Sequence, residues 1–199
     1  MESFEFFVAL ALEADGLVVS EAVKFPVTRP TAKTSHPETQ THQFEVDLVG
    51  ARGDLLVLAT VKSFFGSRGV AAEHVTASGG PPKFQRLYAM INDPVIRQDI
   101  LTGACTRYGY QTDQVEFRLY VGRFAAPTTP AKHADRIRAW CATQHVGAGP
   151  IRVVDVHEVA ATVRRLALSK TYRDHPALTA IKVLDAADML QPLATEPGL

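Results

Sequence analysis

The sequence predicts an α/β fold in which helices flank one central mixed β-sheet. Segments rich in β-branched residues alternate along the chain with segments of helical periodicity. Two of the expected strands are joined by a short polar turn, which is typical of a β-hairpin. Of the 199 residues, 46% are hydrophobic and 21% are charged, so the chain can bury a sizeable core. We therefore expect a single domain over residues 1–199.

The N-terminal part of the chain predicts a helix, a strand and a long loop. Apolar residues recur at helical spacing within residues 2–14, and Gly16 follows where a helix would end. Residues 17–25 are rich in valine and predict a strand that ends at Pro26. Residues 27–42 are polar and rich in threonine and proline, so we expect a long loop there.

The clearest local structure is a β-hairpin. Its arms are residues 44–50 and 55–65, and residues 51–54 form a polar turn that contains glycine. The second arm is almost entirely apolar, as expected of a central strand that is covered on both faces. A glycine-rich stretch, residues 66–82, follows the hairpin.

Helices and strands alternate in the remainder of the chain. We expect one helix or two over 83–106, with a break near Asn92–Pro94, then a strand over 115–124 and a helix over 130–145. A strand over 150–156 and two closing helices over 157–169 and 176–190 follow. The resulting order is α-β-β-β-α-β-α-β-α-α. The apolar stripes of the two closing helices could complete the core or form a dimer interface.

The charges balance overall but are unevenly distributed. The chain holds 21 basic and 21 acidic residues, and this net charge of zero argues against coating of nucleic acid by bulk charge alone. Residues 1–60 carry nine acids and four bases, a net charge of −5, whereas residues 61–199 carry 17 bases and 12 acids, a net charge of +5. Chance alone could produce this split. An acidic cluster in an otherwise basic molecule also suits a metal-dependent enzyme that acts on a polyanion.

Cysteine content and the N-terminal segment predict a soluble, cytoplasmic protein without a membrane partner. The two cysteines, Cys105 and Cys141, are too few for a disulfide framework and show no zinc-type spacing. The N-terminal segment carries acids where a signal peptide would carry basic residues, and its apolar run is too short to cross a bilayer. The sequence also lacks the motifs of P-loop kinases, serine hydrolases and zinc proteases.

Polar side chains lie on both arms of the hairpin. Because strand side chains alternate, Glu45 and Asp47 are expected on one face of their strand, and Thr60 and Lys62 on one face of the next. Asp47 could hold a hard divalent cation, and Lys62 could orient a nucleophilic water or stabilise a charged transition state. The charged residues could instead be solvated surface groups. In an unrelated α/β sandwich Asp47 and Lys62 would lie far apart, so the distance between them is decisive.

The hairpin and the first helix together resemble the PD-(D/E)XK nuclease superfamily. The stretch QFEVDLVGARGDLLVLATVKSF resembles the core of that superfamily, and its E-x-D-L-V form is similar to that of resolvase-like and Mrr-like nucleases. The segment FEFFVALALEADGLVV resembles their first helix, and Glu5 matches the helix acid that sometimes assists the metal site. The resemblance implies hydrolysis of DNA phosphodiesters with Mg²⁺ or Mn²⁺.

The same resemblance implies a restriction-endonuclease-like fold. Its α-β-β-β-α-β core would cover residues 2–124, with additional C-terminal strand and helices over residues 125–190 and a tail over residues 191–199. Nucleases of this kind are often dimers when they cut both strands, so a homodimer is expected. DNA is the expected principal partner, and a protein partner in a larger complex is the alternative.

Thr60 departs from the resembled motif. The second acid of that motif, two residues before the lysine, is a threonine here, which supplies no charge and is a poor ligand for Mg²⁺. Glu45, Glu5 or Glu13 could supply the acid instead, or metal binding could be weak. Alternatively, the chain is a catalytically inactive module that binds nucleic acid or protein. The expected catalytic residues are Asp47, Lys62, Glu45, Thr60 and Glu5, and the expected metal ligands are Asp47, Glu45 and Glu5.

Four further residues are candidate nucleic-acid contacts. Arg68 lies in the segment SFFGSRGV, whose glycines could let the backbone approach a phosphate. Lys83, Gln85 and Arg86 open the helix that borders the active site in the resembled fold. A simple turn and a solvated helix face are the alternative interpretations of these two segments.

Overall fold

Five strands form one mixed sheet in the computed structural model, which describes residues 3–30, 38–126, 132–169 and 174–190. The strands are β1 (Val18–Pro30), β2 (Thr39–Arg52), β3 (Leu55–Lys62), β4 (Val115–Val121) and β7 (Arg152–Asp155), in the order β1-β2-β3-β4-β7. The pairs β1–β2 and β2–β3 are antiparallel, whereas β3–β4 and β4–β7 are parallel. The α/β fold with a mixed sheet flanked by helices is therefore confirmed.

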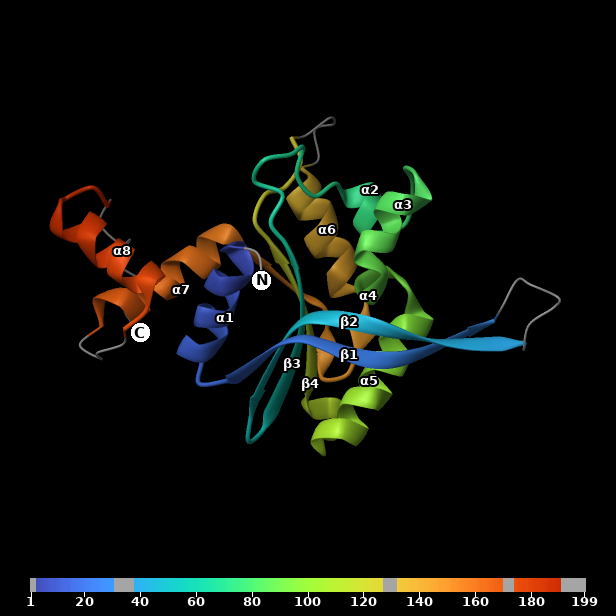
Figure 1. The fold of residues 1–199 in the computed structure, drawn as a ribbon. Coiled ribbons are helices and arrows are strands. Elements are labelled where there is room, and N and C mark those ends of the chain that lie inside the picture. Colours follow the sequence, from blue (N-terminus) through green and yellow to red (C-terminus); the bar gives the residue numbers. More distant parts are fainter. Residues whose placement is uncertain (1–2, 31–37, 127–131, 170–173, 191–199) are drawn as a thin grey trace.

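Helices cover both faces of this sheet (Figure 1). The helices are α1 (Ser3–Ala14), α2 (Ala72–Val75), α3 (Pro82–Gln85), η1 (Arg86–Tyr88), α4 (Ala89–Asn92), α5 (Pro94–Tyr108), η2 (Thr112–Gln114), α6 (His133–Ala142), α7 (Val156–Leu168) and α8 (Pro176–Ala186). Strands β5 (His145–Val146) and β6 (Gly149–Pro150) form a small separate hairpin that the sequence did not predict.

Each face of the sheet carries its own apolar core. On one face α1 and α7 pack on β3 through residues such as Val8 and Val163, which are fully buried. On the other face α5 and α6 pack on the same strand through Ile100 and Ile137, also fully buried. Burying one such side chain contributes about 1.5–3 kcal/mol. Strand β3 is buried on both faces, as its apolar sequence predicts.

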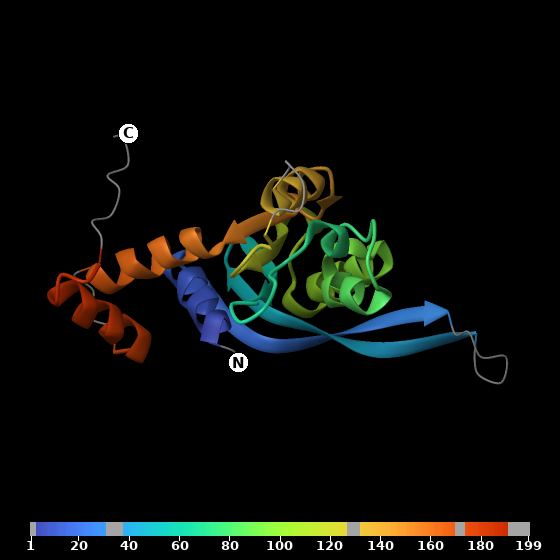
Figure 2. The same cartoon turned by 90° about the horizontal axis from the view of Figure 1, so that it is seen from above.

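The predicted loop over residues 27–42 is wrong at both of its ends, because β1 continues to Pro30 and β2 begins at Thr39, and the two strands form a ribbon. Their ladder extends to the pair Pro30↔Thr39, and residues 31–37 lie outside the described part of the chain. The polar sequence misleads because most of the ribbon surface is exposed to water. Prolines are tolerated here because β1 is the edge strand. Figure 2 shows the ribbon extending beyond the body of the protein.

The segment predicted as one helix or two over residues 83–106 consists of the short helical elements α3, η1 and α4 followed by α5. The predicted break near Asn92–Pro94 is confirmed: the Asp93 carboxylate caps α5 by accepting hydrogen bonds from two backbone N–H groups, at 3.0 and 3.2 Å. Asp93 also pairs with Arg29 of the ribbon, and the Thr28 N–H donates to Asp99 of α5 at 2.8 Å. These contacts therefore hold the ribbon against α5 and the residue that caps it.

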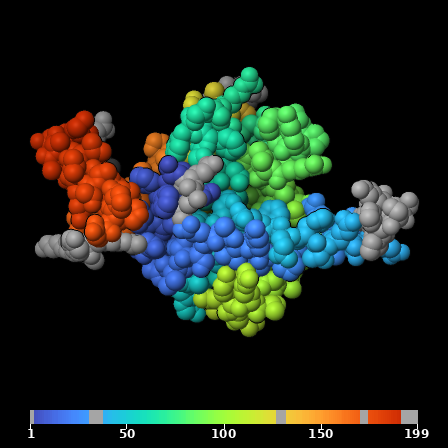
Figure 3. All heavy atoms as spheres, in the orientation of Figure 1, coloured from blue at the N-terminus to red at the C-terminus, as the bar shows by residue number. Residues whose placement is uncertain are grey.

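The C-terminal helices form an extension beside α1. Helix α8 packs on α7 and stands out from the body in the space-filling view (Figure 3). It ends at Ala186 rather than at residue 190, and Val183 on its surface is 62% exposed. No helix in the described ranges is long and apolar enough to cross a membrane.

Candidate functional site

The Asp47 carboxylate closes the sheet where β2 separates from β3. The β2–β3 ladder ends at the pair Leu48↔Ala59. Beyond this pair, Asp47 Oδ2 accepts a hydrogen bond from the Val61 backbone N–H at 2.6 Å and another from the Thr60 hydroxyl at 2.9 Å. The side chain therefore replaces the next backbone hydrogen bond of the ladder.

Lys62 completes this cluster at the last residue of β3. Its Nζ atom lies 3.5 Å from Asp47 Oδ2, and the two side chains are only 19% and 22% exposed. Partial burial reduces screening by water, so their attraction exceeds that of a typical surface ion pair. The hairpin thus brings together the two residues whose separation would have indicated an accidental pattern.

Strand β2 turns about its own axis at Asp47. Strict alternation places Val46 and Leu48 on one face, but Val46 packs in the core beneath α5 and Leu48 in the core beneath α1. The β1–β2 pairing skips Asp47 and Ala22, between the pairs Glu21↔Leu48 and Val23↔Val46, and Ala22 has a φ of +50°, in the left-handed region. Such a conformation costs about 1–3 kcal/mol outside glycine and is concentrated at functional sites.

Glu45 lies outside the cluster because of this turn. Its carboxylate is 3.7 Å from Lys24 Nζ on β1, and the two side chains are 51% and 59% exposed. Glu45 is not among the residues that line the cleft containing Asp47. The geometry therefore does not bring Glu45 to Asp47 as a joint metal ligand, since simple alternation fails at that point of the strand.

Asp47 and Lys62 open into a cleft of about 810 Å³. The cleft lies between the N-terminal end of α1, the middle of β2 at Asp47, the end of β3, the loop after β3 and η1. Its polar residues are Ser3, Glu5, Asp47, Lys62, Ser63 and Ser67. The rest of the lining is Phe4, Val61, Phe64, Phe65, Gly66 and Leu87. Charged and aromatic side chains therefore line one cavity.

Glu5 is the second carboxylate of the cleft. It extends from the first turn of α1 and is half-buried. Glu13, the other candidate acid of this helix, lies in its last turn and does not line the cleft. No group of three or more His, Cys, Asp or Glu side chains positioned to hold a metal occurs in the described ranges. Asp47 and Glu5 are thus the carboxylates that a cation in this cleft could use.

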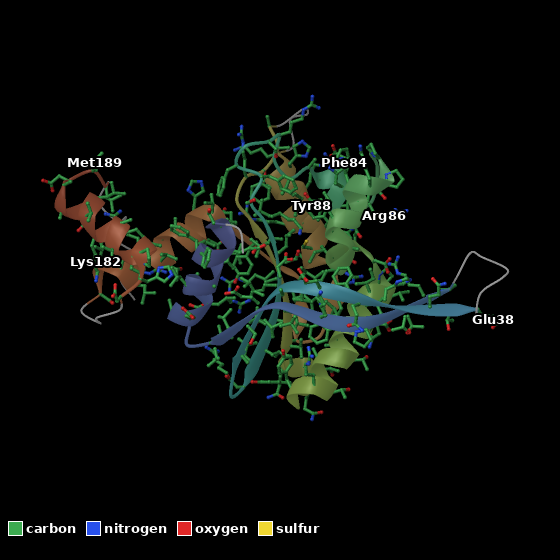
Figure 4. The ribbon with its side chains drawn as sticks, in the orientation of Figure 1. Glu38, Phe84, Arg86, Tyr88, Lys182 and Met189 are labelled. Carbon is green, nitrogen blue, oxygen red and sulfur yellow. The ribbon has the colours of Figure 1, made fainter. Side chains whose placement is uncertain are left out.

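The four candidate nucleic-acid contacts have different environments. Arg68 is exposed in the loop after β3, next to cleft residue Ser67. Lys83 and Arg86 are exposed on α3 and η1, whose arrangement is seen in Figure 4. The Gln85 amide instead donates to the carbonyl groups of Gly79 and Gly80 at 3.0 and 3.2 Å and secures the preceding loop. Its geometry indicates a structural role.

The aromatic lining that Phe64 and Phe65 give to the cleft was not predicted from the sequence. Phe64 and Phe65 follow Lys62 and Ser63 and were assigned to the strand, which instead ends at Lys62. Phe64 has a φ of +47°, and this left-handed residue turns the chain so that Phe65 is 51% exposed. A paired phenylalanine immediately before Gly66 was the available signal for such a turn.

A second polar cavity, of about 410 Å³, lies at the opposite end of α1. Its central group is Arg118 of β4, which is 5% exposed and donates to the Glu116 carboxylate at 2.6 and 2.9 Å. Arg118 also contacts the hydroxyl of Tyr120 at 3.4 Å. Burial raises the pKa of Tyr120, and the positive charge of Arg118 offsets only part of this effect.

Comparison of the chain with protein-family models, curated proteins and solved structures found no match. The site is therefore interpreted from its own geometry and chemistry.

Proposed function

We propose that the protein is a restriction-endonuclease-like, metal-dependent nuclease that hydrolyses DNA phosphodiesters. The proposal is supported by one observation above the others: Asp47 and Lys62 lie 3.5 Å apart in a cleft that is also lined by Glu5. A carboxylate for a cation, a fixed ammonium group and room for a substrate are the elements that phosphodiester hydrolysis requires.

The donor set of the cleft fits Mg²⁺. This ion keeps several waters and is typically held by one or two protein carboxylates together with substrate phosphate oxygens. Asp47 and Glu5 would hold it. Among the described residues, hydrogen bonds to Asp47 fall on Oδ2, which leaves Oδ1 for a ligand. A bound Mg²⁺ supplies a more acidic water and neutralises charge on the phosphate.

Lys62 and Thr60 have separate roles in this proposal. The Lys62 ammonium group carries three donors, which can orient the attacking water and stabilise the negative charge that develops on the phosphate oxygens. The Thr60 hydroxyl and the Val61 N–H hold the Asp47 carboxylate in one orientation before substrate arrives. Thr60 therefore positions Asp47 and contributes no charge.

Cleavage assays with purified protein test the proposal. Wild type is incubated with single-stranded, duplex and branched DNA in the presence of Mg²⁺ or Mn²⁺, and product formation is measured on gels. We expect cleavage that falls about 100-fold or more in Lys62→Ala and in Asp47→Ala. Lys24→Ala, which removes an exposed lysine of the adjacent strand, is the matched control and should retain activity. Inactive wild type, or cleavage unchanged by Lys62→Ala, would overturn the proposal.

The bond between Thr60 and Asp47 favours a second candidate function, a catalytically inactive module that binds nucleic acid or protein. The position two residues before Lys62 carries a hydroxyl donor, and this donor occupies Asp47 Oδ2 at 2.9 Å. Thr60→Glu separates the two candidates. If this variant gains metal-dependent cleavage that wild type lacks, the natural function is binding. Metal-dependent cleavage by wild type excludes the inactive module.

A further inference from the structure

Phe65 is an exposed aromatic side chain that the surrounding structure holds in place. Its ring makes a T-shaped contact with the ring of Phe4, with ring centroids 5.3 Å apart, yet 51% of the residue remains exposed. The Arg123 guanidinium donates to the Phe65 carbonyl at 3.3 Å. A Cβ atom on Gly122 would lie 2.8 Å from the Phe65 ring, so glycine at this position leaves space for the ring. These contacts fix an apolar surface that faces solvent.

The surroundings of Phe65 are chemically divided. On one side the ring borders the cleft that contains Lys62 and Asp47. It also borders a smaller hollow of about 270 Å³, whose other lining residues are Ser3, Phe4, Phe7, Val156, Val159 and Ala160. Leu87, which is 48% exposed, adds a further apolar group to the cleft. A ligand with an anionic part and a flat apolar part would match both the charged and the aromatic lining of the cleft.

Phe84 provides an internal contrast. It is also exposed, at 39%, but the Lys83 ammonium lies 5.0 Å from its ring centroid and His74 packs 5.1 Å away. Lys83 and His74 therefore already pack against the Phe84 ring. Figure 4 shows Phe84 on the segment α3–η1, apart from the end of β3. Phe65 is therefore the stronger candidate for stacking with a ligand.

We infer that this cleft accepts an unpaired nucleotide of single-stranded DNA, with the phosphate at Lys62 and the base on Phe65. The inference rests on the proposed nuclease function and names its substrate class. Bases of a duplex are stacked on one another, so only an unpaired base offers its flat face to an aromatic ring. A duplex would instead present sugars and phosphates to Phe65, which gains nothing from such polar contacts.

Binding measured without metal tests this inference separately from cleavage. A fluorescein-labelled single strand of about 15 nucleotides is titrated with protein in EDTA, alongside its duplex and an RNA of the same sequence, and anisotropy is recorded. We expect the single-stranded DNA to bind about tenfold more tightly than the duplex. Phe65→Ala and Phe65→Leu should weaken single-strand binding about tenfold, whereas Phe65→Trp should retain it. Phe6→Ala is the matched control, because Phe6 is 45% exposed on α1 but does not line the cleft.

Thermal melts identify variants whose loss of binding reflects misfolding, and Phe65→Leu preserves most of the apolar packing if Phe65→Ala unfolds. Equal affinity for single strand and duplex, or unchanged affinity in Phe65→Leu, overturns the inference. Tighter binding of the RNA than of the DNA also overturns it, because the substrate class would be wrong. A protein that binds single strands through Phe65 but cuts no DNA refutes the nuclease proposal and retains this binding site. If the protein cuts DNA but the Phe65 variants bind single strands as tightly as wild type, the inference about Phe65 is wrong and the nuclease proposal stands.

Discussion

The two ends of helix α1 border polar cavities that use buried charge differently. At the C-terminal end, Arg118 is almost completely buried and is matched by Glu116 at 2.6 Å, with Asp15 4.0 Å away. At the N-terminal end, Lys62 and Asp47 are about one-fifth exposed and open into the larger cleft. One cluster is closed by its own partners, whereas the other presents a cation, a carboxylate oxygen and an aromatic surface to solvent.

This difference shows that burial of a charge does not by itself identify a functional site. Arg118 is the more deeply buried cation, but its hydrogen bonds are directed at protein groups from its own strand. Such an arrangement stabilises a fold or fixes its register. The Lys62 cluster retains capacity for a ligand. The two clusters are therefore distinguished better by whether the cation is accessible and where its donor groups point than by how deeply the cation is buried.

The largest expected effect is a separation of activity from stability between matched substitutions. Lys62→Met should reduce DNA cleavage about 100-fold while changing the free energy of unfolding by less than about 1 kcal/mol. Arg118→Met should keep the cleavage rate per folded molecule within about threefold of wild type, because Arg118 and Lys62 lie near opposite ends of α1. Gel cleavage assays and urea denaturation of both variants provide the measurements. A similar loss of activity in both variants would remove the distinction between the two ends.

A smaller effect is expected on the stability of the Arg118 cluster. Arg118→Met removes the guanidinium from a buried ion pair and leaves Glu116, 37% exposed, without its cation. The free energy of unfolding should fall by about 2 kcal/mol, less than for a fully buried pair because water reaches Glu116. Urea denaturation measures the change. Arg152→Met, at a position 53% exposed and paired with Glu158, is the control, with an expected change below about 0.5 kcal/mol. Equal changes in the two variants would contradict a structural role for burial of Arg118.

The start of α7 should contribute stability that depends on pH. Burial raises the pKa of Asp155, but hydrogen bonds from the Glu158 N–H and Arg138 outweigh burial and hold the pKa below its usual value. A lowered folded-state pKa stabilises the protein above the unfolded-state pKa, and this contribution disappears as pH falls through the folded-state value. Asp155→Asn should therefore cost about 1.5 kcal/mol at pH 7 and progressively less below about pH 4.

Denaturation at pH 7 and pH 3 measures this difference, with Asp54→Asn as the exposed control. A gap between wild type and Asp155→Asn that widens on acidification would contradict the assigned sign. Helix α7 lines both the Arg118 cavity and the hollow beside Phe65. The denaturation experiment therefore measures the stability of a helix that packs near both ends of α1.

The smallest effect is expected for the Thr60 hydroxyl. Thr60→Val preserves the shape of the side chain and removes one donor from Asp47, which keeps its bond to the Val61 N–H and its contact with Lys62. We expect a loss of about 1 kcal/mol in the free energy of unfolding. Thermal denaturation compares this variant with Thr28→Val, whose hydroxyl pair on the ribbon is exposed. A stabilised Thr60→Val variant would show that the hydroxyl does not support Asp47.

Local rules were sufficient for the hairpin and the contact between Asp47 and Lys62. Both residues lie just beyond the last pair of the β2–β3 ladder, on arms joined by a short turn, so formation of the hairpin is enough to bring them near each other. The ribbon was missed because threonine- and proline-rich sequence is typical of loops. On an exposed edge strand such residues are tolerated, and exposure is a property of the assembled fold.

The remaining errors concern contacts between segments distant in the sequence. Glu45 turns away because Asp47 bonds the Val61 N–H and β2 twists there, which alternation along one strand cannot predict. The orientation of Phe65 depends on Gly122 and Arg123, which lie just beyond the end of β4, almost 60 residues later in the chain. The sequence identifies these residue types, but only the folded chain brings them together.

Asp47 stabilises the sheet and also lines the cleft, and these two roles affect how relatives of the protein can be classified. A chain that had lost all chemistry would still need an acceptor at this position, because the carboxylate bonds the backbone N–H that β2 leaves unpaired. Lys62 ends β3, and within the described part of the chain its side chain pairs with the Asp47 carboxylate rather than with a backbone group. Retention of the aspartate is therefore a poor diagnostic of activity, whereas retention of the lysine is an informative one.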